Sequence, residues 1–217
     1  MIYATAAVGK EFCEKFSKII SKEGTLNSIY VLTDHPELFS NCEVILYNRE
    51  VWSYVEKIIF LLTLVLESKQ RVTFIDADVC NRLNPKLKLD DEKVYVHDFI
   101  NLSESHNILH PLNKAIDIVT EILCEFNLSH SQSYLFERSM SIPYTHHTEE
   151  ILTLLQKIQP KWESVFNQKN VINVFLERYT KYGVGYCEGA ALNGVLNKFN
   201  TQVEKMNLNL LYKKSIF

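Results

Sequence analysis

A short β-prone run that ends in two aspartates is the feature that most constrains this chain. Residues 72–75 (Val-Thr-Phe-Ile) are followed directly by Asp76-Ala77-Asp78. A short, mostly apolar run beside polar residues is typical of a buried strand in an α/β sheet. Ligands of open α/β sheets bind outside the carboxyl ends of the strands. The run therefore predicts an α/β fold with a ligand site beside the two aspartates.

Two carboxylates one residue apart offer hard oxygen ligands for a divalent cation. Mg²⁺ and Mn²⁺ prefer such oxygens, and a cation of this kind usually also binds the phosphates of a substrate. We therefore expect Asp76 and Asp78 to bind Mn²⁺ or Mg²⁺. In the alternative interpretation, the two acids only cap a turn or the start of a helix.

Composition and charge exclude several classes of function. A chain of 217 residues can bury a sizeable core, and its net charge of −3 without a concentrated basic stripe argues against a dedicated nucleic-acid-binding protein. Five widely spaced cysteines without a CxxC pair favour free thiols in a reducing compartment. The longest apolar stretch, residues 58–66, is too short to span a bilayer, and no signal peptide precedes residue 2. We expect a cytoplasmic protein without a transmembrane segment.

The first third of the chain alternates between strand and helix patterns. Residues 2–7 and 28–32 predict strands, and residues 44–46 predict a short third strand. A helix that ends at Gly24 is expected between the first two strands. Its apolar face is expected to comprise Phe12, Phe16, Ile19 and Ile20. A strand, helix, strand order at this spacing implies a βαβ unit with parallel pairing.

Residues 51–68 give the clearest helix of the sequence. Tyr54 and Lys57 lie three residues apart, so they can face the same neighbour. The helix leads directly into the strand that ends at Asp76. Lys57 could therefore reach a phosphate beside the aspartates, although a solvated lysine at the border of a helix is the commoner case.

The second half of the chain is expected to be mostly helical. Residues 94–96 predict a strand that ends at His97-Asp98, and residues 132–143 predict a strand or a loop. Residues 208–212 could form an edge strand. Helices are expected over residues 111–126, 148–158 (ending before Pro160), 162–176 and 188–199. We expect one α/β domain over residues 1–217, which could be one module of a longer protein.

Several polar residues outside the aspartate pair are candidates for chemistry. Glu188 begins a helix after a glycine-hinged segment, where the helix dipole favours a carboxylate in any case. His97 and Asp98, at a strand end, could bind an acceptor hydroxyl. The adjacent His146 and His147 lie in a loop, where such pairs are more often surface residues than ligands.

Familiar phosphate and nucleophile motifs are missing from the sequence. Gly9-Lys10-Glu11 lacks the upstream glycine and the following Ser or Thr of a P-loop, although Lys10 can still contribute positive charge for a phosphate. The chain has no GxGxxG and no GxSxG sequence. A Rossmann dinucleotide site and a serine hydrolase are therefore disfavoured.

The order of these segments resembles the nucleotide-sugar glycosyltransferases of GT-A fold. The resemblance rests on residues 3–7 (Tyr-Ala-Thr-Ala-Ala), residues 30–34 (Tyr-Val-Leu-Thr-Asp), the helix bearing Lys57, and residues 74–78 (Phe-Ile-Asp-Ala-Asp). Residues 188–193 (Glu-Gly-Ala-Ala-Leu-Asn) look like the acidic "D-Q-x-x-L-N" helix start of retaining members, with Gly in place of Gln. These retaining members include glycogenin-like and blood-group-type transferases. Small soluble transferase domains of large algal viruses and of some bacteria are also similar.

The resemblance implies a GT-A-like, mostly parallel sheet flanked by helices. Residues 1–100 would form the nucleotide-sugar-binding half and residues 101–217 the acceptor side. The implied donor-binding residues are Thr5, Ala6, Ala7, Lys10, Asp34, Tyr54, Lys57, Asp76, Ala77 and Asp78. Asp76 and Asp78 would hold the cation that neutralises the diphosphate leaving group.

The implied reaction moves a hexose from a UDP-glucose-like donor to an oligosaccharide or glycoprotein glycan, with retention of configuration. Glu188 would lie beside the anomeric carbon, and Asp98 is a second catalytic candidate. His97, Tyr144 and His146 would contact the acceptor. Many relatives also supply a metal-binding His near the C-terminus, whereas no His follows His147 here. Either water completes the metal shell, or the chain continues; in a viral setting the protein would act in the host cytoplasm.

Two other functions remain compatible with the sequence. In a haloacid-dehalogenase-type phosphatase, Asp76 would be the nucleophile and Asp78 the general acid. Against this function, two βα units precede the motif, which usually opens such chains, and no convincing later acidic pair follows. In a non-catalytic module, the same site would bind a nucleotide or sugar, and loss of Glu188 would not affect the binding.

Overall fold

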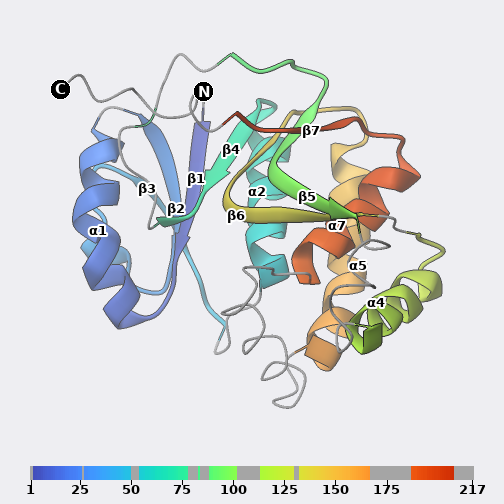
Figure 1. The fold of residues 1–217 in the computed structure, drawn as a ribbon. Coiled ribbons are helices and arrows are strands. Elements are labelled where there is room, and N and C mark those ends of the chain that lie inside the picture. The colour runs from blue at the N-terminus through green and yellow to red at the C-terminus, as the bar shows by residue number, and fades with distance from the viewer. Residues whose placement is uncertain are drawn as a thin grey trace.

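A seven-stranded mixed sheet forms the centre of the protein, with the strand order β3-β2-β1-β4-β6-β5-β7. The computed structural model describes residues 2–25, 27–49, 54–77, 83, 88–101, 113–129, 132–166 and 187–207. Helices cover both faces of the sheet (Figure 1). The predicted fold class, a mostly parallel α/β sheet flanked by helices, is confirmed.

The elements follow one another along the chain as expected for an α/β protein. The strands are β1 (Ile2–Ala7), β2 (Ser28–Thr33), β3 (Glu43–Leu46), β4 (Val72–Ile75), β5 (Val94–Asn101), β6 (Gln132–Ile142) and β7 (Val203–Lys205). The helices are α1 (Lys10–Gly24), η1 (Pro36–Leu38), α2 (Tyr54–Ser68), α4 (Asn113–Glu125), α5 (Thr148–Phe166) and α7 (Cys187–Lys198).

The direction of pairing divides the sheet into two parts. β3, β2, β1 and β4 pair in parallel, which confirms the predicted βαβ organisation. β6 runs antiparallel between β4 and β5, and β7 pairs in parallel with β5. All described strands except β6 therefore run in one direction, so that their carboxyl ends lie along one edge of the sheet.

Two apolar layers hold the helices against the sheet. α1 covers one face, α2 and α7 cover the other, and α5 and α4 pack outside them (Figure 1). Alternate residues of β1 belong to different layers: Tyr3 and Ala7 pack toward the α1 side, whereas Ala4 packs with the buried residues of α2, α5 and α7. The central strand β4 is buried on both faces, as its near-continuous apolar sequence predicts.

The buried face of α1 differs from the predicted face. α1 buries Cys13, Phe16, Ser17, Ile20 and Glu23. The prediction included Phe12 and Ile19, but these side chains are 40% and 37% exposed. The helix is rotated toward Cys13 and Glu23 because buried Glu23 accepts a hydrogen bond from the backbone N–H of Leu83 at 3.1 Å.

The prediction that this helix ends before Pro160 is wrong, because α5 continues through Pro160 to Phe166. Proline removes one backbone donor, so it weakens the helix without forbidding it when packing fixes both sides. Ile158 and Trp162 are both buried, and they hold the turns that flank Pro160 in the core. Apolar contacts thus outweigh the lost hydrogen bond.

The second half of the chain contributes strands as well as helices. Helices α4, α5 and α7 confirm its helical character, but β6 and β7 also join the sheet. The strand predicted to end at His97 and Asp98 is longer than expected, because β5 continues to Asn101. The two residues lie at a bulge within the strand. The edge strand is β7, and the segment predicted for that role, residues 208–212, lies outside the described residues. Within the described ranges, no helix is long and apolar enough to cross a bilayer.

Candidate functional site at the carboxyl edge of the sheet

The strand order places a topological switch point at the carboxyl ends of β1 and β4, and we refer to this place as the crevice. β1 pairs with β2 on one side and with β4 on the other, so the chain changes direction in the sheet between β3 and β4. The β1–β4 ladder ends at Ala4 and Phe74, although β1 continues to Ala7. Such a switch point is where open α/β sheets bind ligands.

Lys57 and Asp76 face each other at this crevice. Asp76 follows β4 directly, and Lys57 lies in the first turn of α2, which begins after the carboxyl end of β3. The Lys57 Nζ lies 3.9 Å from the Asp76 Oδ1. The Lys57 side chain is only 8% exposed, whereas that of Asp76 is 28% exposed. The structure therefore brings these two predicted donor-binding residues together, with the carboxylate nearer to solvent.

The burial of Lys57 corrects the expectation of a solvated lysine at a helix border. Its ammonium lies 5.8 Å from the centroid of the Phe74 ring, on the strand that precedes Asp76. A helix start carries a partial positive charge, and an ammonium there is normally unfavourable. The first turn of α2 and Lys57 therefore place two positive features beside the Asp76 carboxylate.

An ionic network fixes the first turn of α2. Arg49 donates hydrogen bonds to Glu56, the neighbour of Lys57, and to Glu163 of α5. Gln159 of α5 also donates to Glu56 and to Glu163. The hydrogen bond to Glu163 raises the pKa of Arg49, so the guanidinium stays charged. The position of Lys57 is thus secured by α5 as well as by the sheet.

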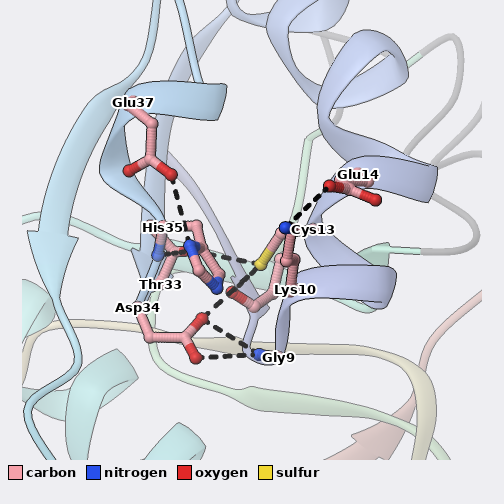
Figure 2. Close-up of polar contacts among 9 residues, drawn as sticks. Gly9, Lys10, Cys13, Glu14, Thr33, Asp34, His35 and Glu37 are labelled. Atoms are coloured by element: carbon pink, nitrogen blue, oxygen red, sulfur yellow. Dashed lines mark hydrogen bonds and ion pairs between the residues drawn. The ribbon is translucent and has the colours of Figure 1, made fainter.

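Asp34 caps the start of α1 next to the crevice (Figure 2). It follows β2, and the backbone N–H of Gly9 donates to its Oδ1 at 2.9 Å and its Oδ2 at 3.1 Å. Gly9 has a φ of 92°, which a residue with a side chain rarely adopts. A carboxylate at a helix N-terminus satisfies a free N–H and the helix dipole. Asp34 therefore occupies the place where this helix could otherwise hold a phosphate.

Cys13, Gly9, Thr33 and Asp34 form a cluster at the start of α1, in which the Cys13 thiol is unreactive. Its thiol donates to the carbonyl oxygen of Ala7 at 3.0 Å and lies 3.4 Å from the Thr33 Oγ1. Burial raises the pKa of the Cys13 thiol, and the negative charge of Asp34 adds to this rise, while the Thr33 hydrogen bond opposes it. The thiol is therefore protonated at neutral pH, and it packs the helix against the strands rather than acting as a nucleophile.

We expect Asp34→Ala to lower the free energy of unfolding by about 1–2 kcal/mol, the usual effect of removing a helix cap. The substitution leaves the Gly9 N–H and the helix dipole without their acceptor. Asp34→Asn keeps one acceptor oxygen, so its loss should be smaller. Urea unfolding followed by circular dichroism checks this order. A fully stable alanine variant would contradict it.

Two neighbours of this cluster differ in exposure: the Lys10 side chain is exposed, whereas the end of β1 is mostly buried. The Lys10 Nζ lies 4.0 Å from Glu14 one turn later, and its side chain is 74% exposed. Thr5 and Ala7 are completely buried between β2 and the α1 layer. Ala6, which is partly exposed, is therefore the residue of this predicted donor-binding segment that a ligand can reach, where β1 extends beyond its ladder with β4.

The remaining predicted residues of this edge are described only in part. Ala77 is buried directly after Asp76. Asp78 lies outside the described residues. Tyr54 begins α2 and Asp98 lies in β5, but their side chains are not described. Val96 of β5 and Phe74 of β4 both pair with Met140 of β6, so the three residues lie side by side across the sheet. The backbone of His97, the residue after Val96, therefore lies level with the end of β4.

Glu188 is the second residue of α7, which confirms the predicted helix start within one residue. The other end of α7 lies at the amino edge of the sheet, where the Phe199 ring is 4.9 Å from the His147 ring. The backbone of Glu188 therefore lies toward the carboxyl edge. Its side chain is outside the described residues.

Tyr144 and His146 do not join the other candidates. Ile142, at the end of β6, pairs with Val72 at the beginning of β4. The loop that carries Tyr144 and His146 therefore leaves the sheet at its amino edge, and the length of β4 alone separates it from Asp76 by roughly 13 Å. Both side chains are exposed at that edge. Their predicted role in the same site as Asp76 is not supported by these positions.

The oxygen donors of the crevice are compatible with a cation shared with a substrate. Among the described residues, no group of three His, Cys, Asp or Glu side chains could hold a metal ion. Mg²⁺ and similar cations are commonly bound by one or two carboxylates together with water and substrate phosphates. The partly exposed Asp76 carboxylate fits such a site, and Asp78 would be its second ligand.

Sequence reasoning missed Gly9 as a residue of this site. A glycine between a strand and the first residue of a helix is a signal for an unusual backbone at the helix cap, which could have identified it. The Arg49, Glu56 and Glu163 network gives no comparable signal, because its members are far apart in the sequence.

No protein-family model matches the chain, and no curated protein sequence matches it either. Among solved structures, the glycosyltransferase GlyE of Streptococcus pneumoniae TIGR4 aligns with 95% of this chain, with a TM-score of 0.46 and 12% identity. The PaToxG glycosyltransferase aligns with 91% of this chain and 69% of its own, with a TM-score of 0.39 and 11% identity. The chain spans 45% of the length of GlyE.

Proposed function

We propose that the protein is a glycosyltransferase that uses a nucleotide-diphosphate sugar. The observation that carries this proposal is the buried Lys57 in the first turn of α2, facing Asp76 at the switch point between β1 and β4. An ammonium and a helix start are two positive features. A diphosphate placed beside them would be attracted to both.

The donor would lie across the crevice with its nucleoside toward Asp34 and its diphosphate toward Lys57. The Asp34 carboxylate already fills the N-terminus of α1, so this helix end disfavours a phosphate. Ala6, the partly exposed residue near the end of β1, would contact the nucleoside. The finer assignment, a UDP-hexose donor, follows from the sequence resemblance.

In the proposed reaction, the bond between the anomeric carbon and the diphosphate oxygen breaks, and the oxygen of an acceptor hydroxyl on a glycan forms the new bond to this carbon. The proton of that hydroxyl passes to the leaving diphosphate. Lys57 would stabilise the negative charge on the leaving diphosphate. Asp76, with Asp78, would hold a Mn²⁺ or Mg²⁺ ion, which supplies further charge neutralisation when bound. Glu188, at the start of α7, would approach the anomeric carbon, and retention of configuration is the expected outcome.

The experiment that tests the proposal is calorimetric titration of the protein with UDP, first with Mn²⁺ and then with EDTA. We expect binding that is strong with Mn²⁺ and weak without it. UDP-sugars should then be screened for slow hydrolysis in the absence of an acceptor. Failure to bind UDP under either condition would overturn the proposal.

The same experiment separates the two alternatives. A non-catalytic module would bind a UDP-sugar without consuming it, even with glycan acceptors present. A phosphatase would release phosphate from a simple phosphomonoester such as p-nitrophenyl phosphate, and Asp76→Asn would abolish this release because Asp76 would be the nucleophile.

A further inference from the structure

The outward side of α1 carries apolar and basic residues on a single stripe. Phe12, Lys15, Ile19 and Lys22 follow one another at spacings of three and four residues, so they share one side of the helix. We call these four residues the α1 stripe. All four are exposed, and Phe12 and Ile19 are among the exposed large apolar residues of the described chain. α1 lies alone on its side of the sheet (Figure 1), and in the described part of the protein nothing covers the stripe.

Phe12 and Lys15 of the stripe both contact the buried Phe16 below them. The Phe12 ring packs against the ring of Phe16, with 4.6 Å between the centroids. The Lys15 ammonium lies 5.0 Å from the Phe16 ring centroid. An aromatic side chain and an ammonium group are thus presented together on the surface, with little conformational freedom left to lose on binding.

The charge of α1 is opposite in sign to that of the whole chain. Its four lysines (Lys10, Lys15, Lys18 and Lys22) are exposed, whereas Glu23 is buried. Only Glu11 and Glu14 are exposed acids on the helix, and Glu14 is paired with Lys10. The full chain carries −3. The exposed side chains of α1 therefore carry a net charge of +2, from four lysines and two glutamates, and Lys15 and Lys22 stand beside exposed apolar side chains.

We propose that the α1 stripe binds the surface of an anionic lipid membrane. A basic amphipathic helix with aromatic and aliphatic residues at its border lies in the interface plane, with the apolar groups in the acyl boundary and the lysines at the headgroups. The long aliphatic stems of Lys15 and Lys22 allow their ammonium groups to reach the headgroups. Two apolar side chains are too few for a stable protein interface, which needs roughly 800 Å² from each partner.

The proposal is independent of the proposed glycosyl transfer, because none of its residues lies in the crevice. Its geometry has one consequence for that function: α1 begins at the carboxyl edge, so membrane contact would hold the crevice close to the lipid surface. An acceptor carried by a lipid would then be within reach.

The test is co-sedimentation of the full chain with vesicles. Wild-type protein should sediment with vesicles of phosphatidylcholine mixed with phosphatidylserine at low salt, but not with phosphatidylcholine alone, and high salt should release it. The Lys15→Gln/Lys22→Gln variant should bind these vesicles more weakly, by roughly five-fold for each lysine. Phe12→Ser/Ile19→Ser should also weaken binding. All four side chains are exposed, so both variants should fold, as circular dichroism can verify.

A matched control replaces two exposed lysines outside α1, as Lys157→Gln/Lys198→Gln, and should bind like the wild type. Equal binding of all variants, binding to neutral vesicles alone, or no vesicle binding would overturn the proposal. Sedimentation equilibrium without lipid distinguishes a second copy as the occupant: a dimer that Phe12→Ser/Ile19→Ser dissociates would also overturn it.

Discussion

Replacing Asp76 by Asn should reduce Mn²⁺-dependent hydrolysis of a UDP-sugar by at least about 100-fold, the usual consequence of removing a charged group that stabilises a developing charge. The Asp76 carboxylate is the partner of Lys57 at 3.9 Å and is the partly exposed acid at the end of β4. Asparagine has nearly the same shape but no charge, so it can neither offset the ammonium nor bind a cation strongly. UDP binding in the presence of Mn²⁺ should weaken in parallel.

The design of this experiment must separate chemistry from folding. Asp91→Asn is a matched control, because Asp91 is an exposed acid in the turn before β5, at the opposite edge of the sheet. It should leave both UDP binding and hydrolysis unchanged. If the asparagine variant is unstable, Asp76→Glu can be tested in its place, because it keeps the negative charge but moves the carboxylate. Full Mn²⁺-dependent binding of UDP by a folded Asp76→Asn protein would place the metal site elsewhere.

Gly24→Ala should destabilise the protein by about 2 kcal/mol, although alanine is the better helix former. Propensity alone would favour alanine by up to about 1 kcal/mol. A Cβ at this last residue of α1, however, would lie 2.3 Å from the backbone oxygen of Asn41 and 2.7 Å from the Cys42 Sγ. Overpacking of this kind typically costs about 1–3 kcal/mol. The steric cost is the larger effect because the nearest atom belongs to the backbone.

The turn that Gly24 contacts has little freedom to move away. Asn41 has a φ of 59°, and the N–H of Ser40 donates to the Ser21 Oγ on α1. Urea unfolding measures the effect, and a decrease of roughly 4–8 °C in melting temperature should accompany it. Lys22→Ala, an exposed change in the same turn, should alter stability by less than about 0.5 kcal/mol. A Gly24→Ala protein at least as stable as the wild type would show that the turn relaxes freely.

The local patterns of the first half were sufficient to predict its architecture. The bounds of β1 and β4 agree with the predicted strands, because each is a short apolar run between clear polar or glycine signals. The parallel pairing of β1, β2 and β3 followed from the spacing of strand and helix. Asp76 lies directly after β4, at the carboxyl edge of the sheet, as the sequence predicted.

The features that depend on distant parts of the chain could not be predicted. The burial of Lys57 depends on α5 and on the Phe74 ring, and Asp34 caps a helix through a glycine that precedes it in the sequence. Tyr144 lies at the amino edge because β6 runs antiparallel, and residues 132–143 alone do not indicate a direction. The glycine hinges at 183 and 185 and the edge strand expected at 208–212 lie outside the described residues. They remain predictions.

The insertion of β6 between β4 and β5 has a consequence for how the chain folds. The first three strands pair with segments that lie close to them in the sequence. β4, in contrast, can pair on its second side only after β6, which begins at Gln132, has been synthesised. β5 likewise pairs with β7, more than 100 residues later in the sequence. Such non-local pairings form slowly. During synthesis, the apolar β4 therefore spends time as an unprotected strand edge, which invites pairing with another chain. Expression of fragments that stop before β6 should accordingly give aggregates, whereas the longer chain protects this edge by its own C-terminal half.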